Sequence, residues 1–163
     1  KEWKETGVDN TCQNCHMPRT KSRLTQKLPL SLLHKPKWVG SHKFLHGDIT
    51  EKDILIEVEF KERFFNFSLL NKTVPHGVPT ADNGDPRIYL YITFLNAAGD
   101  QVDKNKWIIA PQQDTALPFN KKIDFRYRLF DPAVQANIVL KYQPAWSKEK
   151  ELVWEKTARR ESK

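Results

Sequence analysis

Apolar residues alternate with polar ones in short segments after Thr50, and this pattern predicts β-strands. Gly, Asn, Asp and Pro lie between the segments, and no helix of crossover length alternates with them, which argues against a parallel sheet. We therefore expect a mainly β protein with an antiparallel, immunoglobulin-like β-sandwich over residues 51–145. The six predicted strands are DILIEVEF (53–60), RFFNFSLL (63–70), RIYLYITFLN (87–96), KWIIA (106–110), KIDFRYRLF (122–130) and ANIVLKYQ (136–143).

The two ends of the chain lack this alternation. Residues 1–50 show no sustained period of two or 3.6, and Pro18, Pro29 and Pro36 predict an irregular or helical arm that packs on the sandwich. This arm holds four of the five histidines, and such a segment needs something to fold around. Residues 146–163 carry a few apolar side chains among many charges and predict a C-terminal tail or short helix.

Composition narrows the class of protein. The chain has 163 residues, 39% of them hydrophobic, which is enough to bury a core without disulfides. No apolar run approaches 18 residues, so no segment of this chain is expected to span a membrane. The net charge of +7 favours acidic partners, but acids are interleaved with the basic residues, so we expect a solvated basic surface and no nucleic-acid partner.

The strongest chemical signal is the sequence TCQNCH, which contains both cysteines, Cys12 and Cys15, and then His16. A CxxC pair serves as a redox dithiol, as half of a zinc site, or in covalent haem attachment when His follows. A structural zinc site needs two further ligands, and SHKFLHG, which holds His42 and His46, has no helical pattern that would pair them. A redox dithiol needs a strand before it and a helix after it, which the flanking sequence does not supply.

Haem attachment requires these residue types at this spacing. The two thiols add across the two vinyl groups of the haem, and the histidine that follows supplies the proximal imidazole. We therefore expect one covalently bound haem c per chain, with thioethers from Cys12 and Cys15 and with His16 as an iron ligand. The distal ligand is left open by the residues alone, between His34, His42, His46, His76 and no protein ligand.

Three motifs in order resemble a group of periplasmic multihaem cytochromes c. Members of that group show CxxCHMP, then SHxFxG, then a β-sandwich opening with an Asn-led turn that carries GHxxPTG. Here the matching stretches are TCQNCHMP (11–18), SHKFLHG (41–47) and NKTVPHGVPT (71–80), and the resemblance covers residues 2–145. This chain has one CxxCH where members carry several, and Pro75 and Ala81 stand where the third motif has Gly.

The resemblance implies a second iron ligand and a cellular setting. It points to His42 as the distal ligand, which would make His16 and His42 the metal ligands, with His76 as a further cofactor-binding residue. It also implies a periplasmic or extracellular bacterial location, and partners that are other cytochromes or redox proteins in a multi-subunit or multihaem complex.

The expected function is electron transfer. No catalytic base, Ser/His/Asp set or carboxylate pair accompanies the motif, so we name no catalytic residues, and transfer is favoured over catalysis. Two alternatives stay open. The chain could be a haem redox enzyme subunit whose open axial site acts on a nitrogen or sulfur compound, or a haem-based sensor or binding module.

Overall fold

The structure, a computed structural model of the whole chain, describes residues 7, 11–23, 27–40, 48–61, 63–80, 84–129 and 133–160. The chain divides into two compact units. We call Val8–Asp48 the arm unit and Ile49–Lys163 the sandwich unit, and describe each by itself.

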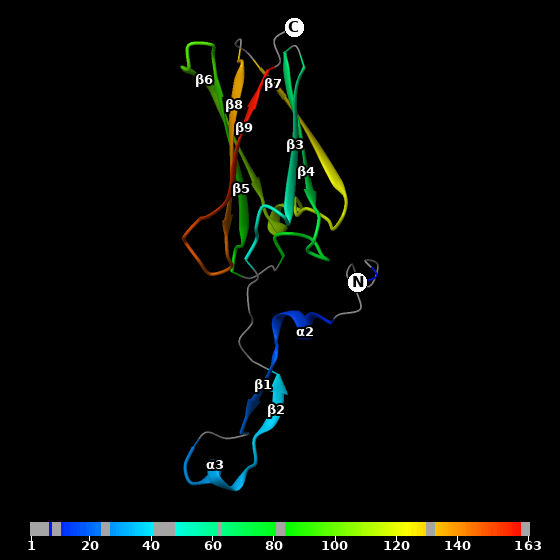
Figure 1. Cartoon of the computed structure of the whole chain (residues 1–163), viewed down its shortest axis with the longest axis vertical. Helices are drawn as coiled ribbons and strands as arrows, with labels where there is room; N and C mark the ends of the chain where they lie inside the picture. Colours follow the sequence, from blue (N-terminus) through cyan, green and yellow to red (C-terminus); the bar gives the residue numbers. More distant parts are fainter. Residues whose placement is uncertain are drawn as a thin grey trace. The chain divides into compact units, whose positions relative to one another are not determined.

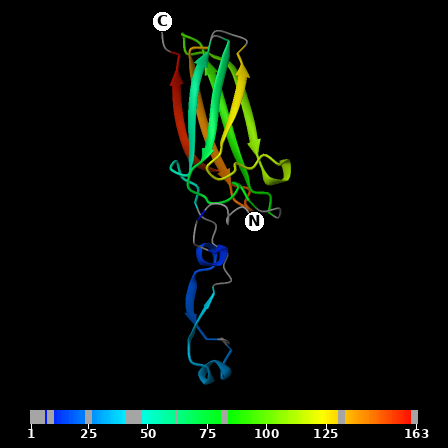
Figure 2. The same cartoon turned by 90° about the vertical axis from the view of Figure 1, so that its right-hand side faces the viewer.

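The sandwich unit consists of two antiparallel sheets that lie as separate layers (Figure 1). Figure 2 shows the face formed by the three-stranded sheet. That sheet has the order β3 (Ile54–Lys61), β4 (Phe64–Asn71), β7 (Lys122–Arg128). The other has the order β6 (Gln101–Ile109), β5 (Arg87–Leu95), β8 (Gln135–Gln143), β9 (Glu151–Arg159), and the short 3₁₀ helix η1 (Pro111–Gln113) follows β6. The prediction of a mainly β, antiparallel fold is confirmed.

Apolar and polar side chains alternate along the strands, so the apolar side chains of both sheets lie between them and form the core. Phe65 from β4 meets Phe94 from β5 edge-on with ring centroids 5.2 Å apart, and both rings are fully buried. Burial of an aromatic side chain of this size contributes roughly 1.5–3 kcal/mol. The other large, fully buried side chains include Ile54, Leu69, Ile88, Leu90, Ile92, Leu117, Ile138 and Leu140.

Two hydrogen bonds join the sheets at opposite edges. The indole Nε1 of Trp154 on β9 donates to the carbonyl oxygen of Ile54 on β3 at 3.1 Å. The hydroxyl of Tyr127 on β7 donates to the Oδ2 of Asp103 on β6 at 2.8 Å. Burial raises the pKa of Tyr127, and the bond to the Asp103 carboxylate raises it further. These two bonds connect the sheets at both edges of the sandwich.

The C-terminal segment differs from the predicted tail or short helix, because residues 151–159 form the edge strand β9. It pairs with β8 from Gln135↔Arg159 to Tyr142↔Glu151, with a bulge at Leu140. Trp154 is buried, while four of the other eight residues of the strand are exposed and charged: Glu151, Glu155, Lys156 and Arg159. A strand that buries so few positions shows no clear alternation in its sequence, and its pairing with β8 decides its structure.

The arm unit contains two short helices and a two-stranded sheet. Helix α2 (Cys12–His16) precedes β1 (Arg19–Ser22), which pairs antiparallel with β2 (Lys37–Gly40) from Arg19↔Gly40 to Ser22↔Lys37. Helix α3 (Leu30–Leu33) lies in the connection between those strands, at the end of the pair away from α2 (Figure 1). The sequence pattern did not predict β1 and β2. No helix in the described parts of the chain is long and apolar enough to cross a membrane.

Candidate functional site

Helix α2 carries the CxxCH motif, and a local cap defines where it begins. Thr11 has extended backbone angles, and its Oγ1 accepts a hydrogen bond from the backbone N–H of Asn14 at 3.3 Å. The carbonyl of Thr11 accepts from the same N–H at 2.9 Å, and Met17 N–H closes the helix by donating to the carbonyl of Gln13 at 2.8 Å. This is the arrangement expected for Thr at an N-cap.

The motif places its three groups on one short helix. Positions 12 and 15 are one turn apart, and His16 is four residues after Cys12 and ends the helix. The thiol of Cys12 is exposed and takes part in no disulfide, and His16 is half-buried. An accessible thiol is what an addition to a vinyl group requires, and positions 12, 15 and 16 belong to one face of a helix.

These residues fit a covalently attached haem. The donor set is two thiols one turn apart with an imidazole directly after the second, and the thiol that the structure describes is free to react. Among the described residues, no three His, Cys, Asp or Glu side chains are grouped to hold a bare metal ion.

The loop that holds His76 lies in the sandwich unit and is organised by one buried asparagine. Asn71 ends β4, is completely buried, and donates from Nδ2 to the carbonyl oxygens of Val74 at 3.0 Å, His76 at 2.7 Å and Leu117 at 3.3 Å. Its Oδ1 accepts from Val74 N–H at 3.1 Å. The loop is further joined to the chain at Val78, which exchanges backbone hydrogen bonds with Leu117 at 2.7 and 3.0 Å.

This loop also sets the tautomer of His76. The Nδ1 of the ring lies 2.8 Å from the carbonyl oxygen of Gly77. Because a carbonyl only accepts, Nδ1 carries the proton, and in the neutral ring Nε2 then bears the lone pair. A backbone carbonyl that orients one ring nitrogen in this way is common for histidines that bind metals through the other. The side chain of His76 is half-buried.

A clasp around Asp53 ties the start of β3 to the same loop. The Oδ2 of Asp53 accepts from the N–H of Thr50 at 2.8 Å and from its hydroxyl at 2.7 Å, and Oδ1 accepts from the hydroxyl of Thr73. Partial burial by itself raises the pKa of Asp53, but the hydrogen bonds from Thr73 and Thr50 outweigh it and lower the pKa below the usual value. The N–H of Lys72 adds a bond to the carbonyl of Asp53 at 2.8 Å.

The other histidines that the sequence offers as iron ligands do not lie on α2. His42 and His46, both within SHKFLHG, lie outside the described residues. His34 follows α3 and is exposed. Cys12, Cys15 and His16 are therefore brought together on α2 of the arm unit, and His76 belongs to the sandwich unit. Sequence reasoning missed Asn71 as the residue that shapes the His76 loop, since its partner Leu117 is 46 residues away.

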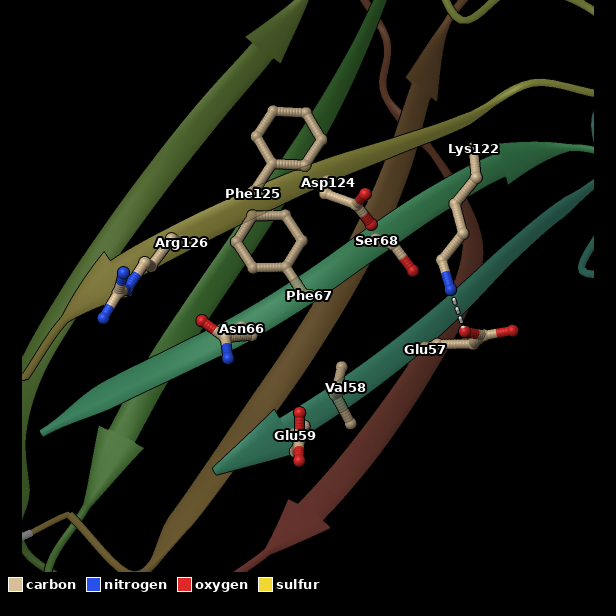
Figure 3. A pocket seen from close by; sticks show the side chains of 10 residues that line it. All are labelled: Glu57, Val58, Glu59, Asn66, Phe67, Ser68, Lys122, Asp124, Phe125 and Arg126. Atoms are coloured by element: carbon tan, nitrogen blue, oxygen red, sulfur yellow. Dashed lines mark hydrogen bonds and ion pairs between the residues drawn. The ribbon is translucent and has the colours of Figure 1, made fainter. Parts of the chain in front are cut away.

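A shallow hollow of about 490 Å³ lies on the outer face of the three-stranded sheet (Figure 3). Neighbouring rows of the register place Glu57, Ser68 and Asp124 side by side, and next to them Glu59, Asn66 and Arg126. Side chains alternate between the two faces of a strand, so these polar residues lie on the outer face while their sequence neighbours point into the core. Its lining residues are Glu57, Val58, Glu59, Asn66, Phe67, Ser68, Lys122, Asp124, Phe125 and Arg126.

The cations of this hollow already have neighbours. The Nζ of Lys122 pairs with Glu57, and this hydrogen bond raises the pKa of Lys122 above its usual value (Figure 3). The guanidinium of Arg126 lies 3.6 Å from the centre of the Phe64 ring. An exposed ion pair contributes little to stability. None of the lining residues is a histidine or cysteine, so the hollow does not offer ligands to a haem iron.

The comparisons with known proteins give a likeness in fold. A solved penta-heme cytochrome c552 from Thermochromatium tepidum is similar, with a TM-score of 0.57 at 16% sequence identity. The match covers 97% of this chain and 49% of that one, so this chain spans about half the length of that cytochrome. Neither a scan of protein-family models nor a search of curated proteins found a match. At this identity the similarity shows a shared fold, which extends over both the arm and the sandwich units.

Proposed function

We propose that the chain is a c-type cytochrome that holds one covalent haem on α2 and transfers electrons within a larger multihaem assembly. The observation that carries the proposal is the CxxCH motif on one capped helix, with Cys12 exposed and free. The fold similarity to a penta-heme cytochrome over nearly the whole chain supports the same reading. When bound, a haem supplies an iron that takes up and releases one electron.

The residues of α2 have separate roles in this proposal. Cys12 and Cys15 form the thioethers, which keep the cofactor on the helix in both oxidation states. His16 would bind the iron as the proximal ligand, and its position directly after Cys15 restricts where the imidazole can go. The Thr11 cap and the Met17–Gln13 hydrogen bond hold the helix that carries these groups. Removal of such a cap typically costs about 1 kcal/mol.

The distal side determines whether the iron exchanges electrons or binds a substrate. We assign it to His42, the histidine of the SHKFLHG motif, and take His76 as the second candidate because its Nε2 has the lone pair of a ligand. Two imidazole ligands would leave no open position on the iron for a substrate, which suits electron transfer. Ligation of this kind lacks the methionine that raises the potential, so we expect a low reduction potential.

The setting follows from the same chemistry. Covalent haem attachment to CxxCH implies a periplasmic or otherwise extracytoplasmic location in a bacterium, and one haem exchanges electrons only with near neighbours. We therefore infer that the partners are other cytochromes or redox proteins.

The ferric spin state of the purified protein tests the electron-transfer proposal. We expect low-spin iron in the parent and a shift towards high spin in His42→Ala, because loss of a strong-field imidazole leaves the iron five-coordinate or bound to water. His34→Ala is the matched control and should leave the spectrum unchanged. If His42→Ala stays low-spin, His76→Ala is the next variant. A parent protein with covalent haem but high-spin iron would contradict electron transfer and favour the enzyme with an open axial site.

A further inference from the structure

Helix α3 and its flanks have the reverse of the usual burial pattern. Within α3 the buried residue is Ser31, while Leu30, Leu32 and Leu33 are exposed. We call residues 27–38 the leucine tip. Five of the eight large hydrophobic side chains that are exposed in the described parts of the chain lie in it: Leu28, Leu30, Leu32, Leu33 and Trp38, with 54–77% of each exposed. Clustered exposure of this kind marks an interaction surface.

The charge around the leucine tip has one sign. The sequence from Thr11 to Gly47 contains no Asp or Glu. Six basic residues lie on β1, on β2 and in the connection between them: Arg19, Lys21, Arg23, Lys27, Lys35 and Lys37. The partner of this surface must therefore offer both apolar groups and negative charge, because only such a partner satisfies the leucines and the lysines together.

The place of the leucine tip in the fold separates it from the haem-binding motif. The tip connects the ends of β1 and β2 at the Ser22↔Lys37 pair, and α2 precedes the other end of β1. The four-residue ladder between them is roughly 13 Å long. Figure 1 shows α3 at the end of the β1–β2 pair away from α2. A cofactor attached to α2 does not account for apolar side chains at the opposite end.

We propose that the leucine tip docks onto an anionic lipid surface, with its leucines and Trp38 at the acyl boundary and its lysines at the headgroups. Leu and Trp with Lys at the margin are the residue types that hold proteins at membrane interfaces. A short chain segment can anchor there when apolar burial and basic charge act together, since neither is sufficient alone. The assignment does not depend on the haem.

The size of the tip favours a lipid surface over a protein. A stable protein interface uses about 20–30 residues on each side. The leucine tip has 12 residues, and its exposed leucines extend from a four-residue helix. A bilayer sets no minimum area, because each side chain that enters it adds its own contribution.

Co-sedimentation with lipid vesicles tests the proposal on the full-length protein. We expect binding to vesicles of phosphatidylcholine with phosphatidylglycerol, and weak binding to phosphatidylcholine alone. The double variant Leu32→Ser, Leu33→Ser should lower the partition coefficient about tenfold or more, because two leucines no longer enter the bilayer. The double variant Lys35→Gln, Lys37→Gln should lower it about thirtyfold at low salt, at about 1 kcal/mol for each lysine. Surface substitutions of this kind leave stability nearly unchanged.

Matched variants of the sandwich unit serve as controls. Leu152 on β9 is 60% exposed, so Leu152→Ser tests for a general loss of surface apolarity. Lys104 and Lys148 are exposed, so Lys104→Gln with Lys148→Gln tests for a general loss of charge. Both controls should bind as the parent does. Absence of vesicle binding, or equal losses in the controls and the tip variants, overturns the proposal. So does a leucine variant that binds vesicles normally but exchanges electrons more slowly with an acidic redox protein, a result that assigns the tip to a protein partner.

Discussion

The two units of the chain differ in what holds them together. The sandwich unit has a continuous core between its sheets, in which large side chains such as Phe65, Phe94 and Leu90 are fully buried. In the arm unit, Ser31 is the one buried residue among the side chains that the structure describes. The sandwich unit therefore contains its own source of stability, whereas the described part of the arm unit has two short helices, one four-residue ladder and no apolar core.

The difference between the two units indicates that the arm unit needs a bound group for its stability. Chain segments of about 40 residues rarely bury enough apolar surface to offset the loss of chain entropy, and units of this size commonly rely on disulfides, metals or cofactors. The arm unit holds both cysteines and four of the five histidines. We infer that a haem on α2 supplies the apolar surface around which the arm folds, and that the sandwich folds without it. The predictions below test this division.

The largest expected effect comes from replacing both thiols. Cys12→Ala with Cys15→Ala should abolish covalent haem, and the arm unit should then become sensitive to protease, because it loses the group that orders it. The sandwich unit should resist digestion as before. Limited proteolysis followed by mass spectrometry measures both units in one sample. An arm that resists protease equally in the parent and the variant would contradict the division of stability between the units.

The second prediction concerns the stability of the sandwich unit. Trp154→Ala should destabilise it by about 3–5 kcal/mol, because it leaves a cavity and removes the hydrogen bond to the carbonyl of Ile54. Trp154→Phe keeps most of the ring and should cost about 1 kcal/mol for the lost hydrogen bond. Urea unfolding followed by circular dichroism measures both. The visible spectrum of the folded variants should equal that of the parent, and a change in the haem bands would show that the two units are coupled.

The next effect concerns the loop that holds His76. Asn71→Ala should destabilise the sandwich unit by about 2–3 kcal/mol, because it removes the hydrogen bonds that this buried amide makes to the backbone of Val74, His76 and Leu117. Asn66→Ala is the matched control, since Asn66 lies on the outer face of the same strand and should cost less than about 0.5 kcal/mol. Equal destabilisation by the two variants would show that the loop does not depend on Asn71.

The smallest effect depends on pH. The pKa of Asp53 is lowered in the folded protein, so its ionised form contributes stability above the ordinary value of 3.8, and this contribution is lost as the pH falls through the folded pKa. Asp53→Asn should destabilise by less than about 1 kcal/mol at neutral pH, since solvent screens a carboxylate that is only partly buried. The difference from the parent should vanish in acid. A difference that persists unchanged below the ordinary value, measured by thermal unfolding at several pH values, would contradict the sign of the shift. Asp124→Asn is the control carboxylate.

Local signals in the sequence predicted most of the sandwich. Strands β3, β4, β5, β7 and β8 have alternating or continuous apolar runs because one or both of their faces are buried, so the sequence pattern indicates them directly. Of β6 (Gln101–Ile109) only the end from Lys106 was predicted, because residues 101–105 are mostly polar. The CxxCH motif lies within five residues, and the structure shows one helix there. Strand β9 was not predicted because it has one fully buried residue, Trp154, among charged neighbours. Its structure depends on pairing with β8, which the local sequence does not show.

The features that the sequence did not predict are of two kinds. Some depend on contacts between residues that are far apart in the chain, and one is a set of apolar side chains that are exposed. The role of Asn71 requires Leu117, and the edge bond of Trp154 requires Ile54, 100 residues away. No pattern in one segment contains such a pair. The exposure of the leucine tip was not predicted for a different reason. The stretch LPLSLL has the composition of a buried segment, and the structure shows those leucines exposed.

The most direct test of the central claim is the intact mass of the purified protein, read together with its absorption spectrum in alkaline pyridine after denaturation. We predict the mass of the polypeptide plus one haem, and a c-type band pattern that stays with the chain. A polypeptide mass without haem, from cells able to attach haem to CxxCH motifs, would contradict the claim and return Cys12 and Cys15 to thiol or metal chemistry.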